Sequence, residues 1–359
     1  MNYKFSYENS AINHKTDNIF DLPNPSSVLD FSINNNILKT PRNITKALKS
    51  LRTDIRPDLK YRKAILNISG HHKIKPENIV IDNGIFSLMN NALKTLKARN
   101  AMIVMPCEPI IKQICRLNNC DVTKYIISEK QNFKLDADDI IEKIDSKSDI
   151  LIISNPSNAT GRVISKNNMT NILDYCQSKG IYVIVDETYM DFVFNDMSII
   201  NLIDAYHNLV VLRSPSEYYN TSGINSAYAI APAEITELLS QNILPYQIDV
   251  YANAFLEKIY TFDKFDLNTK KWIFDEKKSF LNNLSNIKNV KVIPSDCHIM
   301  LIRLEDNLAS TVHSRLIKSN ILIRDASSFN GVDGSYIRIA LKDKKSNLKL
   351  IDSLFHCIL

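Results

Sequence analysis

The middle of the chain alternates short apolar runs with amphipathic stretches. Helices are predicted at 85–96 and 166–178, and Gly180 ends the second one. Because continuous apolar strands separated by helices are buried on both faces, the pattern indicates an α/β domain with a mostly parallel sheet. The strands are predicted at six apolar runs rich in Ile, Val and Ala: 78–81, 101–105, 149–153, 181–185, 209–212 and 227–231.

The pattern changes near residue 265. A long amphipathic helix is predicted to about residue 284, then strands at 290–293, 299–302, 321–323 and 336–339, and a closing helix. This mixture indicates a smaller α+β domain, and 359 residues also exceed one typical core. We therefore predict a polar, irregular segment 1–45, a large domain 46–262 and a small domain 263–359. The first segment is expected to pack on the small domain or on a partner subunit.

Composition and charge narrow the function classes. The chain is 45% hydrophobic and 23% charged, as in ordinary soluble proteins, and its net charge of +5 is scattered, so no nucleic-acid partner is expected. No apolar run reaches the roughly 18–20 residues of a membrane span, and the first residues lack a signal peptide's apolar segment. We expect no membrane partner and a cytoplasmic location. The six cysteines show no metal-ligand spacing, which favours buried free thiols and no metal site.

One segment carries the most specific signal. Residues 211–223 have the sequence VLRSPSEYYNTSG, in which a strand is followed by Ser214, Ser216 and, further on, Gly223. The segment resembles the lysine segment of class I and II aminotransferases, where a strand leads to Ser-x-Ser-Lys and a glycine follows six residues after the lysine. Glu217 stands at the position of that lysine. In the family the lysine forms a Schiff base with pyridoxal phosphate (PLP) and then moves the substrate's α-proton.

Two more segments resemble the same family, most closely its histidinol-phosphate aminotransferase and threonine-phosphate decarboxylase branch. Residues 155–161 (NPSNATG) are similar to Asn-Pro-x-Asn-Pro-Thr-Gly, and residues 185–192 (VDETYMDF) contain Asp-Glu-x-Tyr-x-x-Phe. The resemblance implies that Asn158 and Tyr189 contact the phenolic oxygen of the cofactor. It also implies that Asp186 keeps the pyridine nitrogen protonated, at a strand end where open α/β sheets bind ligands.

The phosphate of the cofactor has its own expected site. Residues 82–87 (DNGIFS) resemble the turn at which a helix N-terminus receives that phosphate, so Gly84 and Ile85 are implied as ligands. Ser214 and Ser216 would add hydroxyl donors. Gly84, Gly161 and Gly223 are three of only seven glycines, and we expect them where φ is positive or a backbone approaches closely.

Three polar residues are implied as substrate ligands. Arg338, in the apolar run 336–339, resembles the family's arginine that clamps the substrate carboxylate bidentately. Arg324, in the segment 323–329, would face a further anionic group. Asn34 belongs to a stretch that keeps the asparagines of the family's Asn-x-Asn-Pro-x-Gly.

The resemblance extends from about residue 29 to the C-terminus. It implies the aspartate-aminotransferase fold (PLP fold type I), with a mostly parallel seven-stranded sheet in the large domain and a smaller α+β C-terminal domain. It also implies a homodimer, because the family places its cofactor at the subunit interface.

Other positions depart from the family pattern. Asn225 stands where an arginine binds the phosphate, Arg56 where a tyrosine reaches the neighbouring subunit's phosphate, and Ile111 where an aromatic residue stacks on the ring. Residues 34–39 lack the proline and glycine of the family stretch. Such scattered changes indicate natural divergence. Replacing Lys by Glu and Arg by Asn makes the site more negative, and each unit interaction with a phosphate charge is worth about 2–3 kcal/mol at roughly 6 Å.

Three interpretations follow. The protein is an enzyme that binds PLP, pyridoxamine phosphate (PMP) or a PLP–amino acid adduct weakly and without a covalent link, with Glu217 as acid–base group and a small amino acid or amino-acid phosphate as substrate. Alternatively, it is a non-catalytic homologue that serves as a binding or regulatory protein. In the third interpretation the pocket holds another small anionic ligand, bound by Arg338 and the helix N-terminus.

Overall fold

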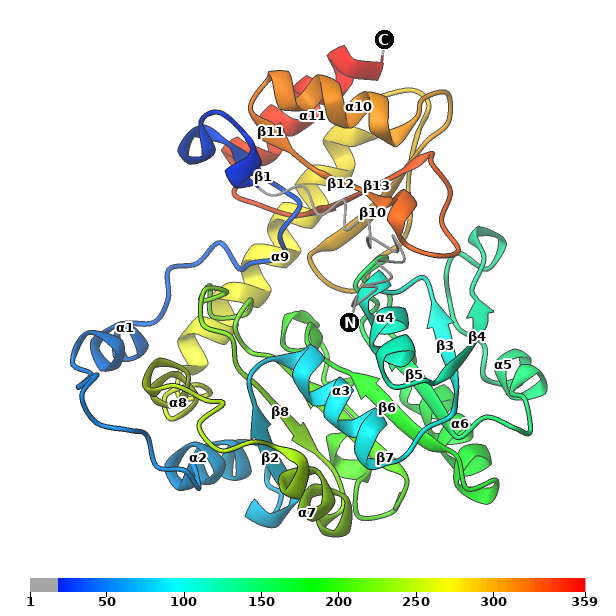
Figure 1. The fold of residues 1–359 in the computed structure, drawn as a ribbon. Helices are drawn as coiled ribbons and strands as arrows, with labels where there is room; N and C mark the ends of the chain where they lie inside the picture. The colour runs from blue at the N-terminus through cyan, green and yellow to red at the C-terminus, as the bar shows by residue number, and fades with distance from the viewer. Residues whose placement is uncertain (1–18, 359) are drawn as a thin grey trace, which may run out of the picture.

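A seven-stranded sheet organises the large domain of the computed structural model, which describes residues 19–358 (Figure 1). Its order is β2-β8-β7-β6-β5-β3-β4, and β8 alone runs antiparallel to its neighbours. The strands are β2 (Ile79–Asp82), β3 (Asn100–Met105), β4 (Asp121–Ile126), β5 (Ile150–Ser154), β6 (Tyr182–Asp186), β7 (Leu209–Arg213) and β8 (Ala227–Ile230). The predicted mostly parallel sheet is confirmed.

Helices cover both faces of this sheet, so its strands are mostly apolar, except for the edge strand β4. One face packs against α3 (Ile85–Thr95), α4 (Pro109–Leu117) and α7 (Ala233–Asn242). The other packs against α2 (Arg62–His72), α5 (Ala137–Lys143), α6 (Lys166–Ser178) and α8 (Val250–Leu256). The bounds of α3 and α6 agree with the amphipathic patterns that predicted them.

The small domain is a four-stranded antiparallel sheet with helices against it. Its order is β12-β13-β10-β9, from β12 (Arg324–Asp325), β13 (Tyr336–Ala340), β10 (Ile299–Leu304) and β9 (Val290–Val292). The long α9 (Asp263–Leu284) runs from the large domain into the small one (Figure 1). There it packs against α11 (Lys344–Ile358), which also packs against α10 (Ala309–Lys318).

The N-terminal segment joins the small domain where it is described. β1 (Leu29–Asp30) pairs in parallel with β11 (Ile321–Leu322). The segment is less irregular than expected, since it contains short 3-10 helices and since α1 (Arg42–Lys49) begins before residue 46. Residues 1–18 of the predicted segment lie outside the described residues, and the three domain boundaries stay a prediction.

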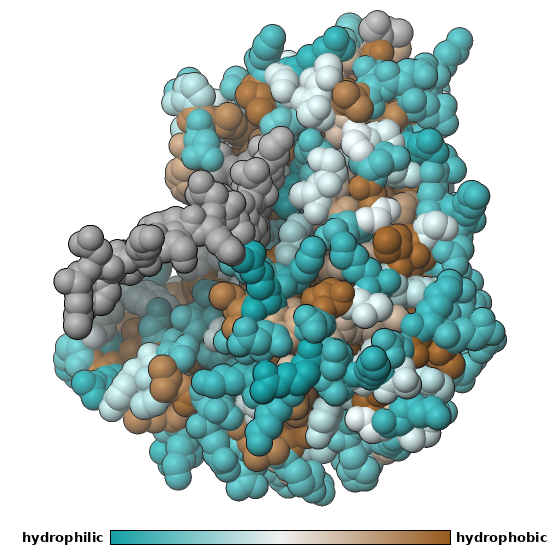
Figure 2. Space-filling view, turned by 45° about the vertical axis from the view of Figure 1, so that its right-hand side comes forward, coloured by the Kyte–Doolittle hydropathy of each residue, from teal (hydrophilic) through white to brown (hydrophobic). Residues whose placement is uncertain are grey.

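The surface and the thiols complete the description. Hydrophilic residues cover most of the face in Figure 2, with apolar residues interspersed. Within residues 19–358, no helix combines the length and the apolar character needed to cross a bilayer. All six cysteines are free and buried, as predicted.

Candidate functional site

The carboxyl ends of three parallel strands bring the central residues together. β5, β6 and β7 are neighbours, so the loop that begins at Asn155, the end of β6 at Asp186 and the segment after Arg213 meet at one edge of the sheet. Asn155 N–H donates to the backbone oxygen of Asp186 at 2.8 Å. The Asp186 carboxylate accepts from the Thr188 amide (3.0 Å) and hydroxyl (2.6 Å). Burial nevertheless raises the pKa of Asp186, and the charge of Glu108 adds to the rise.

Tyr189 links four of the predicted residues. Its hydroxyl oxygen accepts from the side-chain amide of Asn34 at 2.9 Å and, more weakly, from that of Asn158 at 3.4 Å. Arg338 donates to the other end of the Asn34 amide. The Asn158 amide oxygen is buried and has no partner within the described chain, so it is available to a ligand. We call Asp186, Asn158, Tyr189 and Asn34 the ring end.

Glu217 enters the same buried region. Its backbone oxygen accepts from Asn36 N–H at 2.9 Å, while its carboxyl oxygen Oε2 is buried without a partner among residues 19–358. Burial raises the pKa of Glu217 to about 7, and the charge of Asp186 adds to the rise. Burial also raises the pKa of Tyr189 well above 10, with the charge of Glu217 as the next cause. A carboxyl group that titrates near neutral pH can both accept and release a proton under working conditions.

The second region, which we call the phosphate end, comprises Gly84, Ile85, Ser214, Ser216 and Asn225. Gly84 has a φ of +90° and begins α3, whose Ile85 amide has no backbone acceptor within the described chain. The Asn225 side chain donates to the Asn83 oxygen at 3.1 Å and covers Gly84 so closely that a Cβ there would lie 2.3 Å from its Oδ1. The Gly84 amide donates to the Asp82 oxygen at 2.9 Å, so the Ile85 amide is the one left for a small anion at this turn.

The two serines of the phosphate end differ from the expectation. The Ser214 hydroxyl donates to the Ser226 oxygen at 3.2 Å, and that of Ser216 to the Ile224 oxygen at 2.7 Å. Both protons are thus used by the backbone in this conformation. An adjoining opening of about 390 Å³ is lined by Asn83, Gly223, Ile224, Asn225, Gln247, Asp249 and Tyr251, none of which is basic.

Arg56 does not add its charge to that opening within this protomer. It is exposed, donates to the Tyr246 hydroxyl at 3.0 Å and lies 4.5 Å from the centre of that ring. Gly223 is also less constrained than expected, because its φ is not positive and a Cβ would meet nothing within 4 Å. Gly161, by contrast, has a φ of +69° and lies against the small domain, where a Cβ would approach Ser295 Oγ to 2.3 Å.

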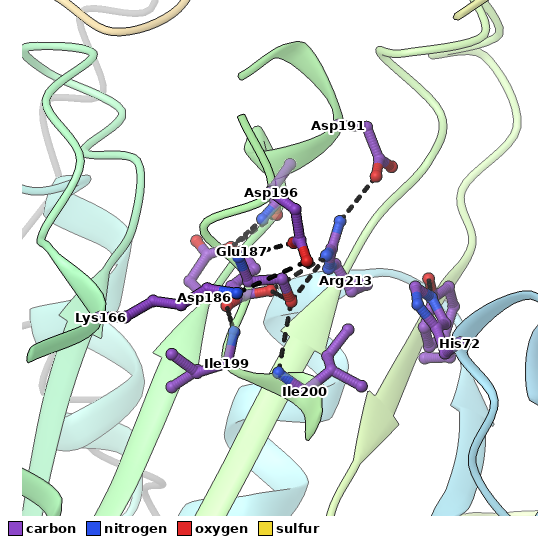
Figure 3. A network of polar contacts seen from close by, with 12 residues as sticks. His72, Lys166, Asp186, Glu187, Asp191, Asp196, Ile199, Ile200 and Arg213 are labelled. Atoms are coloured by element: carbon purple, nitrogen blue, oxygen red, sulfur yellow. Dashed lines mark hydrogen bonds and ion pairs between the residues drawn. The ribbon is translucent and has the colours of Figure 1, made fainter. Parts of the chain in front are cut away.

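A buried ion network fixes the strand ends beneath the site (Figure 3). Arg213, at the end of β7, pairs with Glu187 at 3.0 Å and with Asp191 at 2.8 Å. Glu187 also accepts from the Ser198 hydroxyl (2.6 Å) and the Ile199 amide (2.9 Å). The network therefore anchors the residue immediately before Ser214, a role that the sequence analysis did not assign to Arg213.

His298 is a second positioning residue that the sequence analysis missed. It is fully buried, hydrogen-bonds the backbone oxygen of Asn34 at 2.7 Å and stacks on Phe192 at 3.8 Å. Burial lowers its pKa to about 3, so the ring is neutral. A lone histidine at the start of an apolar strand was the available signal.

Within residues 19–358, no group of three or more His, Cys, Asp or Glu side chains is arranged to hold a metal ion.

The chain is similar to proteins of named activity. The profile of the family "Aminotransferase class I and II" matches residues 26–354. The chain belongs to this family. It is 26% identical to the threonine-phosphate decarboxylase of Salmonella typhimurium (92% of this chain, 91% of the relative) and 26% identical to the histidinol-phosphate aminotransferase of a Thermoanaerobacter species (89% and 88%).

A solved structure agrees with these relatives. The histidinol-phosphate aminotransferase of Clostridium acetobutylicum has a TM-score of 0.86 to this chain at 26% identity, covering 92% of this chain and 98% of the other. This confirms the predicted PLP fold type I, and the family implies PLP as cofactor.

The residues present fit such a cofactor unevenly. The ring end offers a carboxylate, an unpartnered amide oxygen and a phenol, which suit the nitrogen and hydroxyl of a pyridine ring. The phosphate end offers the Ile85 amide but no basic side chain around its opening, and its Gly84 amide donates to the Asp82 oxygen. The residues therefore suit the ring of the cofactor better than its phosphate.

Proposed function

We propose that this member of the family binds PLP, PMP or an adduct of PLP with an amino acid without a covalent link, and acts on an amino acid or amino-acid phosphate. The observation that carries the proposal is the carboxyl group of Glu217, whose Oε2 is buried without a partner among residues 19–358. The charge of Asp186 raises the pKa of Glu217, and the charge of Glu217 raises the pKa of Tyr189. Residue 217 matches the position of the family's lysine. A glutamate can move a proton there but cannot bind an aldehyde covalently.

Each polar group has a role in this proposal. Asp186 faces the ring nitrogen, Asn158 and Tyr189 the ring hydroxyl, and the Ile85 amide at the Gly84 turn the phosphate. Arg338, held by Asn34, takes the substrate carboxylate. When bound, the ring of the cofactor supplies an electron sink for the bond that breaks at the substrate's α-carbon.

Glu217 has the proton-transfer role. Burial and the charge of Asp186 raise the pKa of Glu217 to about 7. Below that pH the carboxyl group is protonated and can donate a proton, and above it the carboxylate can accept one. The neutral His298 keeps the Asn34 loop in place and adds no charge. The bound substrate would displace water from this already buried group, which strengthens its coupling to Asp186.

A second candidate has its own support. The opening at the phosphate end contains Asp249 and no basic residue, which opposes a phosphate dianion. This favours a non-catalytic binding protein, or a pocket that holds another small anion at Arg338. The two candidates differ in whether a pyridoxal compound binds at all.

The deciding experiment is a visible absorption spectrum of the purified protein with added PLP, before and after borohydride. The expected result is a spectral shift on mixing. Dialysis should remove the pyridoxal compound from the protein both without and with borohydride treatment. An unchanged PLP spectrum at high protein concentration would favour the second candidate. A chromophore that borohydride fixes to the protein would overturn the non-covalent proposal.

We also propose that the protein is a cytoplasmic homodimer. Its free, buried cysteines suit a reducing compartment. Ile55, Leu59, Leu244 and Tyr246 are large apolar side chains at the surface of neighbouring loops, as an interface requires. Light scattering should give twice the chain mass at micromolar concentration, whereas a monomer mass throughout would contradict the proposal.

A further inference from the structure

Two buried arginines lie side by side in the small domain. Arg324 of β12 and Arg338 of β13 are direct cross-strand partners, only 5% and 3% exposed. Like charges at such positions repel, and buried guanidinium groups require anionic or polar partners. Burial lowers the pKa of Arg338, and the charge of Arg324 lowers it further. The pair therefore needs compensating negative charge.

The hydrogen-bond partners of the pair supply little of that charge. Arg338 donates to the neutral Asn34, and Arg324 donates to the Ser328 hydroxyl at 3.2 Å. Both guanidinium groups lie over the Phe329 ring, at 5.4 Å and 6.0 Å. The Nε atoms of both are buried and have no partner among residues 19–358. Each arginine thus retains donor capacity for a ligand.

One carboxylate approaches the pair, and it comes from the other domain. Glu108 precedes α4 in the large domain, and its Oε2 lies 4.0 Å from the Arg324 NH2 atom. No other carboxylate of the described chain lies within that distance of either guanidinium group. The charge of Glu108 also acts on Arg338, Asp186 and Tyr189, so this side chain faces the candidate site.

The charges of this region allow one additional anion. The charges of Arg324, Arg338 and Lys342 against those of Glu108 and Asp30 leave a single positive charge, which a substrate carboxylate at Arg338 would neutralise. A second anionic group on the same substrate would have to displace Glu108 from Arg324, or lie against its carboxylate. The first separates a charge pair and the second brings two like charges together, and both are unfavourable where the side chains are only 7% and 21% exposed.

We propose that Glu108 is a specificity-determining residue, which occupies the anion position opposite Arg324 and restricts the pocket to amino acids with one carboxylate and a neutral or cationic side chain. This inference rests on the proposed function only in taking an amino acid as the ligand. It separates the chain from relatives whose names specify phosphorylated substrates.

The test compares L-threonine with O-phospho-L-threonine, which differ by the phosphate alone. Calorimetric titration of the full-length protein should show tighter binding of L-threonine. Glu108→Gln should shift the ratio of the two affinities at least about tenfold towards the phosphorylated ligand, because one unit charge is removed at short range. Glu129→Gln is the matched control. Glu129 also pairs across the domains, with Arg303 at 2.6 Å, and its side chain is 23% exposed against 21% for Glu108.

The control variant should leave the ratio unchanged. Tighter binding of O-phospho-L-threonine by the natural protein, or an equal shift in both variants, overturns the inference. Inorganic phosphate gives a readout that does not depend on the proposed function or on binding of either amino acid. It should raise the melting temperature of the Glu108→Gln variant more than that of the natural protein or the Glu129→Gln variant. An equal rise in all three proteins would again overturn the role of Glu108, while the PLP spectrum tests the proposed function separately.

Discussion

The ring end and the phosphate end of the candidate site are built differently. At the ring end, Tyr189 accepts hydrogen bonds from Asn34 and Asn158, and Asp186 is held by Thr188. At the phosphate end, the two serine hydroxyls donate to backbone carbonyls and Asn225 covers Gly84. The difference teaches that groups suited to a planar ring and groups suited to a phosphate are supported by separate sets of contacts. Residue 217 lies between the two.

The largest expected effect is covalent capture at residue 217. Glu217→Lys should form a borohydride-stable link with PLP, because a lysine there faces the same Asp186 and Tyr189. Glu217→Gln and the natural protein should form none in the segment 211–223. Peptide mass spectrometry after borohydride measures this directly. A stable adduct in the natural protein at Lys342, a half-buried lysine whose pKa burial and the charge of Arg338 lower to about 8, would restore ordinary Schiff-base chemistry.

The next effect is a pH-dependent stability difference. The pKa of Glu217 is raised from 4.5 to about 7, so its contribution to the free energy of unfolding is present below pH 4.5 and is lost as the pH rises through 7. Glu217→Gln has no such loss. In urea unfolding, the free energy of unfolding of the variant relative to that of the natural protein should rise by on the order of 3 kcal/mol between pH 4.5 and pH 8. A constant difference across that range would show that Glu217 is solvated.

A smaller effect separates two glycines. Gly161→Ala should lower the free energy of unfolding by about 1–3 kcal/mol, because φ is positive there and the added Cβ would meet Ser295 and the Ile299 oxygen. Gly223→Ala, at the phosphate end, should change stability by less than about 0.5 kcal/mol. Equal losses in thermal unfolding would mean that the phosphate end is as tightly packed as the loop beside the small domain.

The smallest effect concerns charge at the phosphate end. Asn225→Arg should raise the affinity for PLP about tenfold, since it adds a cation beside the amides of Gly84 and Ile85. Asn225→Gln keeps the site neutral and should give no gain. Fluorescence titration with PLP measures both. If the two variants bind equally, the phosphate does not sit at this turn.

The sequence predicted most of the fold because its signal lies in local apolar runs. β4 (Asp121–Ile126) was not located, since five of its six side chains are partly or fully exposed at the sheet edge and include Asp121, Thr123 and Lys124. Six helices were also not predicted: α1, α2, α4, α5, α7 and α8. The strands of the small domain were placed correctly. The division of residues 321–325 between two sheets was not predicted, because the pairing with β1 joins segments far apart in the sequence.

The candidate site was predictable where motifs are short and contiguous. Asn158 and Tyr189 do meet, Asp186 binds the start of the Asn158 loop through its backbone oxygen, and Gly84 and Gly161 do have positive φ. The direction of the Ser214 and Ser216 hydroxyls depends on carbonyls from a later loop, which no local pattern encodes. Glu108 was missed for the same reason, because its partner Arg324 lies in the other domain.

The support of the segment that contains residue 217 has a consequence for its history. Asn36 binds the backbone of residue 217, Arg213 anchors the preceding strand, and the Tyr219 hydroxyl accepts from Tyr260 N–H at 2.8 Å. None of these contacts uses the side chain at 217. The backbone at 217 is therefore held whatever its side chain, and an exchange of side chains here leaves these supporting contacts in place.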